Sequence, residues 1–328
     1  MKEYKNIYRL IIILSGISVT SVAFSQTEKQ LMPSDLKQQT IVTEPVTLKK
    51  GFIRAGSILN YRVADKYFSD EGVKEYYLSN TWGTRTSFSF TLQYGLSDRL
   101  ELELMGEYMD TRQESEKSEY IAATNTTRSI VTKQKGSGIG DTYLRIRYQL
   151  LPESKYFVSL TGTIQAAIPT GEKNPTDIRS AEKYDLPVGT GNYALSGGLY
   201  GRSILYPYSF TAAINYTWNF EGSKKFSAAD ADEVKFRMGN IIEAEAGVNL
   251  HLNEWIVFSN EIVYNHKDKG SINGNLSALL PVSWSVSYEP GLVFQVKRFR
   301  LGESVNIPLR GISIPADPLY VILIQYIF

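Results

Sequence analysis

The amino-acid sequence predicts an all-β fold, a transmembrane antiparallel up-and-down β-barrel of about 12 strands, of the bacterial outer-membrane type. Three observations lead to this prediction: apolar and polar residues alternate with a period of two, short and long connections alternate between these segments, and the chain begins with an export signal. The period is clear in "YSFTAAINYTWNF" (208–220), where Phe210, Ile214 and Trp218 share one face and polar residues occupy the other.

The first 25 residues have the pattern of a secretory signal peptide. Basic residues precede an apolar run that starts at Leu10, and the small residues Ala23 and Ser25 form a cleavage site. The run is interrupted by polar residues and is short for a bilayer span of ~20 residues, which favours cleavage over a membrane anchor. We expect residues 1–25 to be a signal peptide, 26–48 a polar periplasmic leader and 49–328 the transmembrane barrel.

Composition and charge argue against several classes of protein. The chain has 328 residues, is 43% hydrophobic and has a formal net charge of +1, so it is neither compositionally disordered nor basic like a typical nucleic-acid binder. It has no Cys, and its 2 His are far apart in the sequence and form no metal-ligand spacing. We therefore expect no metal, no cofactor and no nucleic-acid partner.

Twelve segments carry the strand pattern. In "LELELMGEY", for example, Leu102 and Leu104 alternate with Glu101 and Glu103. The predicted strands cover 50–62, 84–95, 99–109, 139–150, 155–168, 191–202, 207–220, 235–250, 255–266, 279–296, 298–309 and 318–328.

The connections between these strands fall into two alternating classes. Those after even-numbered strands are tight, namely "GLSD", "LPES", "SILY", "HLNE" and "VK", whereas the others are longer and polar, and include 110–137 and 170–190. This alternation is typical of a barrel with periplasmic turns and extracellular loops. Pro290, inside the tenth strand, and Glu303, on an apolar face, do not fit, and a β-bulge near Gly291 or Gly302 would accommodate them.

The polar faces of the strands decide which side points to the interior. They carry many charges, and burying these in a sandwich core would cost several kcal/mol per unpaired ion. A soluble barrel that exposes them outward is the alternative. Aromatic residues beside the short turns, such as Tyr94, Tyr148, Tyr156, Tyr208 and Trp255, instead favour a girdle at the lipid headgroups. The lumen-lining candidates are therefore Glu101, Glu103, Glu107, Asp141, Arg145, Arg147, Glu243 and Glu245.

These charges have a structural and a functional interpretation. Glu101, Glu103 and Glu107 on the third strand face Asp141, Arg145 and Arg147 on the fourth, so they can form a salt-bridge ladder that holds the register. They can also form a charged lining that orients polar or ionic solutes in a narrow pore. The two interpretations are compatible, and the first is favoured.

The last residues resemble the assembly signal of bacterial outer-membrane barrels. Phe328 ends the chain, and Tyr326, Ile324 and Ile322 lie on the same face of the last strand. We expect Phe328 and Tyr326 to be recognised by the barrel-assembly machinery, and outer-membrane lipid to surround the barrel.

Five short stretches resemble, in order, the outer-membrane family named for the meta pathway of phenol degradation. They are "VTLKKGFIRAG" (46–56), "YGLSDRLELEL" (94–104), "GSGIGDTYLRIRYQLL" (136–151), "AAIPTGEK" (166–173) and "LPVGTGNYALSGGLYG" (186–201). The resemblance covers most of residues 45–328. It implies a twelve-stranded barrel with a transporter role, and solutes that are aromatic or apolar.

The glycine-rich stretch before Asp141 also has a structural explanation. We expect Gly136, Gly138 and Gly140 to supply unusual backbone dihedral angles where a long loop re-enters a strand. A phosphate-binding loop would need a helix after it, and a strand follows here. Residues 169–171 are expected to end a strand at the extracellular rim.

Catalysis is not expected. Outer-membrane phospholipase has the same strand count and carries its Ser two residues after the catalytic His, whereas Lys267 and Asp268 follow His266 here. The other histidine, His251, is expected in a periplasmic turn, and Ser271, in the loop after His266, is not placed for catalysis by strand geometry.

We therefore expect a channel or transporter-like barrel in the outer membrane of a Gram-negative bacterium, which lets small molecules pass without energy input. Its lumen is expected to be narrow, or filled by a loop or the leader. The alternative is a barrel whose long loops bind a partner or surface ligand without transport.

Overall fold

The computed structural model describes residues 47–77, 82–121, 126–152, 158–177, 183–226 and 230–328. The predicted signal peptide and all of the predicted leader except its last two residues lie outside this part of the chain. The described residues contain no helix, and thus none that is long and apolar enough to span a membrane.

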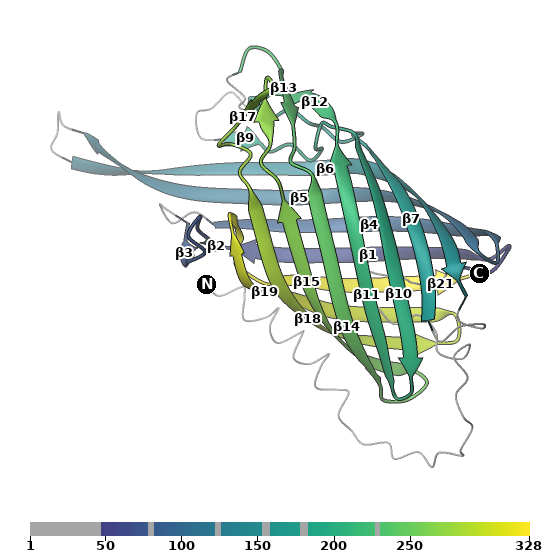
Figure 1. The fold of residues 1–328 in the computed structure, drawn as a ribbon. Coiled ribbons are helices and arrows are strands. Elements are labelled where there is room, and N and C mark those ends of the chain that lie inside the picture. Colours follow the sequence, from purple (N-terminus) through teal and green to yellow (C-terminus); the bar gives the residue numbers. More distant parts are fainter. Residues whose placement is uncertain (1–46, 78–81, 122–125, 153–157, 178–182, 227–229) are drawn as a thin grey trace. The chain divides into compact units, whose positions relative to one another are not determined.

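Twelve strands form one closed antiparallel barrel, as predicted (Figure 1). Their order around the barrel is β5, β4, β1, β21, β19, β18, β15, β14, β11, β10, β7 and β6, and the pairing of β5 with β6 closes it. The barrel strands are β1 (Ile53–Ala64), β4 (Trp82–Ser97), β5 (Leu100–Ile121), β6 (Thr126–Leu151), β7 (Val158–Ile168), β10 (Ala194–Leu205), β11 (Tyr208–Asn219), β14 (Ile241–His251), β15 (Ile256–Lys267), β18 (Ser283–Val296), β19 (Phe299–Ile312) and β21 (Leu319–Ile327).

Within the described residues, nine short strands lie in the longer connections. They are β2 (Lys66–Phe68), β3 (Lys74–Tyr76), β8 (Thr176–Asp177), β9 (Lys183–Asp185), β12 (Glu221–Lys224), β13 (Val234–Arg237), β16 (Ser271–Ile272), β17 (Asn275–Leu276) and β20 (Ile314–Pro315). The predicted strand 235–250 is thus divided into β13 and β14, because residues 238–240 leave the ladder.

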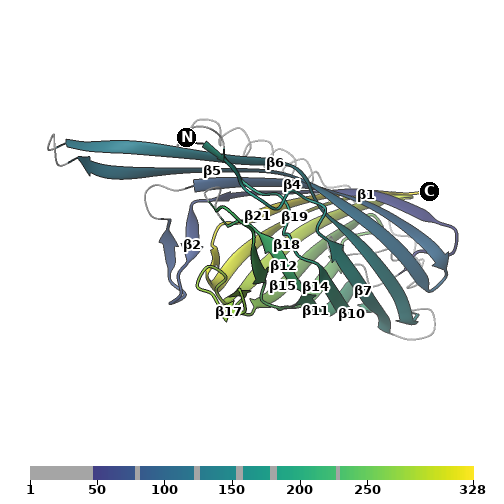
Figure 2. The ribbon, with the colours of Figure 1, turned by 90° about the horizontal axis from the view of Figure 1, so that it is seen from above.

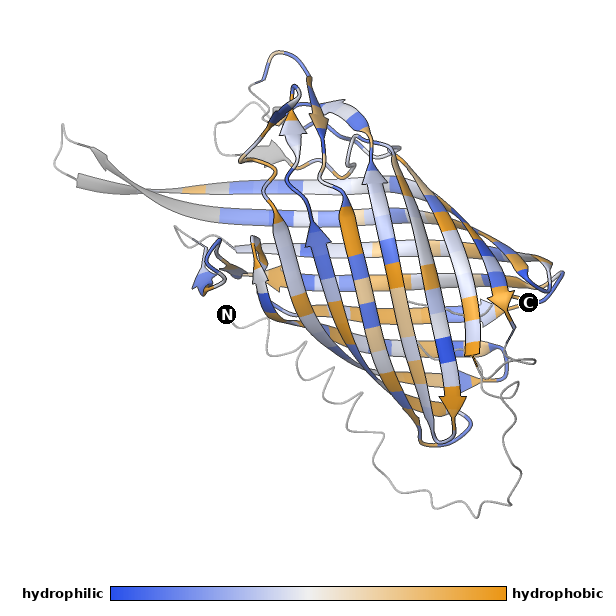
Figure 3. Ribbon diagram, viewed as in Figure 1, coloured by the Kyte–Doolittle hydropathy of each residue, from blue (hydrophilic) through white to orange (hydrophobic). Residues whose placement is uncertain are grey.

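The barrel turns its apolar side chains outward. Along β11, Phe210, Ile214 and Trp218 are 43, 54 and 53% exposed, whereas Ser209 and Thr211 between and beside them are 0 and 7% exposed. Figure 3 shows the same alternation of apolar and polar residues on neighbouring strands. An apolar exterior over a polar interior is the arrangement of a barrel that sits in lipid, so the predicted orientation is confirmed.

Short turns and both ends of the barrel sequence share one rim, here called the short-turn rim. Two-residue turns join β4 to β5 and β18 to β19, and Arg54 at the start of β1 pairs with Ile327 at the end of β21. Aromatic residues there are exposed: Tyr94, Tyr148, Tyr208 and Trp255 are 43–51% exposed, as expected of a girdle. Tyr156 lies outside the described residues.

The prediction that residues 110–137 form a loop is wrong. β5 and β6 remain paired from Leu100↔Tyr148 to Ile121↔Thr126 and form a long two-stranded ribbon, which Figures 1 and 2 both show extending beyond the other strands. The period-two signal reports a strand only where one face is apolar. Both alternating faces of 110–137 are mainly polar in sequence, so no such signal appears there.

The exceptional residues of β18 and β19 are accommodated differently from the prediction. The register shift lies between Val286 and Ser287, whose partners are Arg310 and Pro308, and not at Gly291 or Gly302. Glu303 stays on the outer face, opposite Leu292 on one side and Ile322 on the other.

Candidate functional site

The interior near the short-turn rim is filled by polar and charged side chains. Each of the following is at most 7% exposed, and together they are called the packed half: Arg54, Gln93, Glu101, Glu103, Arg147, Gln149, Arg202, Asn249, His251, Glu261, Arg300 and Gln325. Charges at this level of burial need partners, because an unpaired buried ion costs several kcal/mol.

The predicted salt-bridge ladder between the third and fourth barrel strands supplies such partners. β5 and β6 place Glu101 opposite Arg147 and Glu103 opposite Arg145. Arg147 Nη1 lies 3.4 Å from Glu101 Oε1, its Nη2 lies 3.4 Å from Glu103 Oε2, and Arg145 Nη1 lies 3.4 Å from the same Glu103 oxygen. Gln93 Nε2 donates a further hydrogen bond to Glu103 over 3.1 Å.

The residues just before β1 add to the packed half. Thr47 and Leu48 are 6 and 5% exposed, and the Leu48 N–H donates a 2.7 Å hydrogen bond to Glu101 Oε2. The backbone of Lys49 passes so close to Gly95 that a Cβ there would collide with the Lys49 carbonyl. These contacts fill the space beside Glu101.

The prediction for His251 is wrong. It is the last residue of β14 and not part of a turn, and its Nε2 lies 3.3 Å from Ser209 Oγ. His251 and Ser209 are 3 and 0% exposed, so a substrate bond has no access to that hydroxyl. The other histidine, His266, lies 3.3 Å from Asp268 Oδ1 and has no hydroxyl partner among the described residues.

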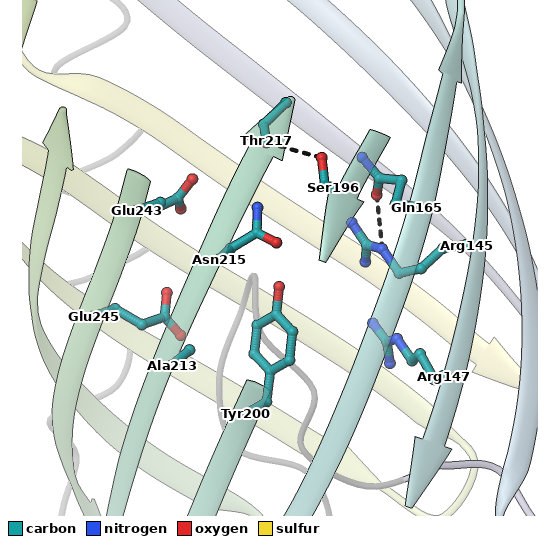
Figure 4. Close-up of a pocket in the computed structure, with 10 residues that line it drawn as sticks. All are labelled: Arg145, Arg147, Gln165, Ser196, Tyr200, Ala213, Asn215, Thr217, Glu243 and Glu245. Atoms are coloured by element: carbon teal, nitrogen blue, oxygen red, sulfur yellow. Dashed lines mark hydrogen bonds between the residues drawn. The ribbon is translucent and has the colours of Figure 1, made fainter. Parts of the chain in front are cut away.

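A cavity of about 260 Å³ lies beside the packed half, between the walls formed by β6, β7, β10, β11 and β14 (Figure 4). Its lining residues are Arg145, Arg147, Gln165, Ser196, Tyr200, Ala213, Asn215, Thr217, Glu243 and Glu245.

The charges of this cavity are separated by sign. Arg145 and Arg147 on β6 lie on one side, Glu243 and Glu245 on β14 lie on the other, and Asn215 and Tyr200 lie between them (Figure 4). Arg145 Nε donates a 2.7 Å hydrogen bond to Gln165 Oε1, and the Ser196 and Thr217 hydroxyl groups are 2.8 Å apart. The cavity is therefore mainly polar, with a field directed across it.

The eight predicted lumen-lining residues are thus divided. Arg145, Arg147, Glu243 and Glu245 line the cavity, and Glu101 and Glu103 lie in the packed half. Glu107 lines neither region, and follows the register shift at Gly106.

Asp141, the last of the eight, holds a loop in place. It is 3% exposed and accepts hydrogen bonds from Gly171 N at 3.2 Å, Thr190 N at 2.9 Å and Thr190 Oγ1 at 2.6 Å. It therefore ties both ends of the connection between β7 and β10 to β6.

The glycines before Asp141 have a different role from the predicted one. None of Gly136, Gly138 and Gly140 has a positive φ. A Cβ on Gly136 would instead collide with the Leu186 carbonyl, and Gly171 packs against Gly140. Gly136 and Gly171 are thus small because another backbone passes close to each of them. β7 ends at Ile168, which agrees with the predicted strand end before 169–171.

The sequence analysis missed the neutral residues of the cavity. Tyr200, Asn215 and Gln165 lie on the inner faces of their strands, and the outward neighbours Leu199 and Ile214 are 47 and 54% exposed. Their alternation with exposed apolar residues was the available signal. Tyr200 was hidden because Tyr also occurs on the outer faces of barrels.

The two predicted assembly-signal residues lie on the outer face at the end of the chain. Tyr326 and Phe328 are 43 and 59% exposed, and their rings contact edge to face at 4.9 Å. The Phe328 N–H donates a hydrogen bond to the Ile53 carbonyl over 2.8 Å.

No protein-family model matches the chain, and no curated protein matches its sequence. Among solved structures, an outer membrane channel from Pseudomonas putida F1 is 15% identical with a TM-score of 0.65, and the match covers 91% of this chain and 100% of that chain. The translocator domain of the autotransporter NalP from Neisseria meningitidis is 9% identical with a TM-score of 0.47, over 85% of this chain and 89% of that chain. The first likeness shows the fold, a β-barrel of the outer-membrane type. Membership of the family that the short motifs resemble stays a prediction.

Proposed function

We propose that this barrel lets small molecules pass across the outer membrane without energy input. The observation that carries the proposal is a polar cavity inside a closed barrel whose exterior is apolar. The likeness to the Pseudomonas putida F1 protein, which is described as an outer membrane channel, supports it.

The packed half limits what can pass. Residues such as Glu101 and Arg147 are 0 and 3% exposed, so the interior near the short-turn rim holds no open path around them. A solute must therefore displace these side chains. We expect slow passage of small solutes and a small conductance, as opposed to the behaviour of a wide porin.

The structure limits the size of the solutes that pass more than it limits their chemical class. Aromatic or apolar solutes are what the family resemblance implies, and they stay a prediction. A panel of aromatic compounds, fatty acids, sugars and amino acids tests them, with uptake measured into liposomes that contain the purified full chain.

Two neighbouring alanines of β11 give a matched pair of variants. Ala213 lines the cavity and Ala212 faces outward. We expect Ala213→Trp to fill much of the cavity and to lower uptake of admitted solutes several-fold, whereas Ala212→Trp leaves uptake unchanged. Both variants are checked for heat-modifiable migration, which reports a folded barrel.

The opposite result supports the alternative. If the wild-type chain admits no solute and passes no current in planar bilayers, the proposal is wrong. The ribbon of β5 and β6 is then the region to test for binding of a partner, because it extends away from the other strands (Figure 2). The barrel-assembly machinery and lipid stay predicted partners.

A further inference from the structure

We propose that the interior cavity binds a small zwitterion, a molecule with a carboxylate at one end and an ammonium group at the other. The inference deepens the proposed function and rests on it, because it assigns a solute class to the same interior. The occupant is expected to place its carboxylate near Arg145 and its ammonium group near Glu243.

The acidic wall has a carboxylate with no protein partner among the described residues. Glu243 lines the cavity, yet its side chain makes no hydrogen bond or ion pair with any of them. Glu101 and Glu103 of the packed half differ, since both contact Arg147. A carboxylate that faces a cavity without a cation attracts a positively charged group.

The basic wall has donors that remain available. Arg145 uses Nε for Gln165 and Nη1 for Glu103, and its side chain is 23% exposed. Its Nη2 donates no hydrogen bond within the described part of the chain. Arginine presents its donors in a fork that matches a carboxylate, so Arg145 can bind one while it stays anchored to Gln165.

The space between the acidic and basic walls is lined by polar groups that are available for hydrogen bonds. The Asn215 amide and the Tyr200 hydroxyl both lie there and have no side-chain partner among the described residues (Figure 4). Gly198 gives them room, because a Cβ there would lie 2.9 Å from Asn215 Oδ1 and 3.2 Å from Tyr200 Cε2. Polar groups that converge on one cavity are typical of a binding site.

The distribution of charge disfavours the other solute classes. Two arginines and two glutamates line the cavity, so the formal charges of the lining cancel. A simple anion is repelled by the two glutamates, and a simple cation is repelled by the two arginines. An apolar solute displaces water from charged groups and offers them no hydrogen bond. Compared with these three classes, a zwitterion places an opposite charge at both walls at once.

The test is a binding titration that requires no passage. Ligand-observed NMR is recorded for the full chain in detergent with 4-aminobutyrate and, in separate titrations, with butyrate, butylammonium and butyramide, which keep the carbon chain and remove one or both charges. We expect saturable binding of 4-aminobutyrate that is at least about tenfold tighter than binding of the other three.

Three variants in or beside the cavity, with two matched controls outside it, locate the bound molecule. Glu243→Gln and Arg145→Gln are each expected to weaken 4-aminobutyrate binding by about tenfold or more, since each removes one charged contact. Glu107→Gln makes the same change of charge as Glu243→Gln outside the cavity and should leave binding unchanged. Gly198→Ala should weaken binding without any change of charge, whereas Gly197→Ala, where the nearest atom to a new Cβ is 3.9 Å away, should not.

Two results overturn the inference. Equal binding of the four probes means that the cavity does not distinguish charged from uncharged ends. No binding of any probe means that the cavity holds water alone. Because the titration needs no transport, a chain that binds 4-aminobutyrate but admits no solute into liposomes contradicts the proposed function and leaves the binding site standing.

Discussion

The packed half and the cavity are built from the same residue types on some of the same strands, yet they differ in what their charges contact. Arg147 and Glu101 have side chains that are 4 and 0% exposed and are paired with each other. Two residues earlier on β6, Arg145 is 23% exposed and borders the cavity that Glu243 faces. Position along the strand, more than residue type, therefore separates a structural charge from a candidate binding group.

Two local causes produce this difference. Near the short-turn rim, Thr47 and Leu48 occupy the interior beside Glu101, and polar side chains from all sides meet. Farther along the strands, small residues such as Ala213 and Ser196 line the wall and leave room. The comparison predicts that equal substitutions in the two regions have unequal effects.

The largest expected effect comes from breaking the buried pair. Glu101→Ala removes one of the carboxylate partners of Arg147 and the acceptor of the Leu48 N–H, so we expect the free energy of unfolding to fall by about 3–5 kcal/mol. Glu243→Ala removes no hydrogen bond or ion pair with the described residues and should cost less than about 1 kcal/mol. Urea unfolding of the folded barrel in detergent measures both values. Similar losses for the two variants would show that the two regions do not differ.

A smaller effect is expected where the connection between β7 and β10 passes over β6. Gly136→Ala places a methyl group against the Leu186 carbonyl, which should cost about 1–3 kcal/mol and release the connection from β6. Gly138→Ala is the matched control, because its Cβ would meet Val188 Cγ2 at an ordinary 3.6 Å. Proteolysis of residues 183–193 reports the release. Equal protection of the two variants would contradict the close approach.

The outer face of the short-turn rim should be less sensitive still. Deletion of Phe328 removes its edge-to-face contact with Tyr326 and is expected to cost about 1 kcal/mol in the refolded barrel. In cells, the same deletion should strongly reduce the amount of folded barrel in the outer membrane if the barrel-assembly machinery recognises Phe328. Normal assembly of the shortened chain would refute that predicted signal.

The smallest effect concerns an exposed contact between two of the longer connections. Hydrogen bonds from Asn174, Lys173 and Ser223 lower the pKa of Glu233 to about 2. A carboxyl group whose pKa is lowered in the folded state adds stability above its unfolded pKa of about 4.3, and this stability is lost as the pH falls from there toward 2.

A spin label at Ala231 measures this loss as increased mobility between pH 5 and pH 2, as estimated from these two pKa values. In the Glu233→Gln variant, which cannot titrate, mobility should stay constant over the same interval. If Glu233→Gln shows the same change of mobility with pH as the wild type, the change is caused by other titrating groups.

Much of the barrel could be predicted from sequence because its outer face is apolar. Wherever one face meets lipid, as along 208–220, the alternation is strong and all twelve strands are found. Where both faces meet water the signal disappears, which is why the ribbon of β5 and β6 was predicted to be a loop. The bulge opposite Val286 leaves no mark in the alternation either.

The site was predicted in part for a related reason. Alternation shows that Arg145 and Glu243 face inward, but it does not show how deep along the barrel each one lies or what fills the space beside it. The burial of Glu101 depends on Leu48, 53 residues away in the sequence, and the space around Asn215 depends on Gly198 of the neighbouring strand. Glycine roles at 136–140 likewise required knowledge of the connection that covers them.

The orientation of β11 tests the central claim most directly. The chain has no Cys, so single cysteines at the neighbouring positions Ile214 and Asn215 can be labelled without background. We predict that a fluorophore on Ile214→Cys is quenched by nitroxide lipids in the bilayer, and that Asn215→Cys instead reacts with a small water-soluble thiol reagent. Quenching at Asn215→Cys together with aqueous reactivity at Ile214→Cys would contradict the account.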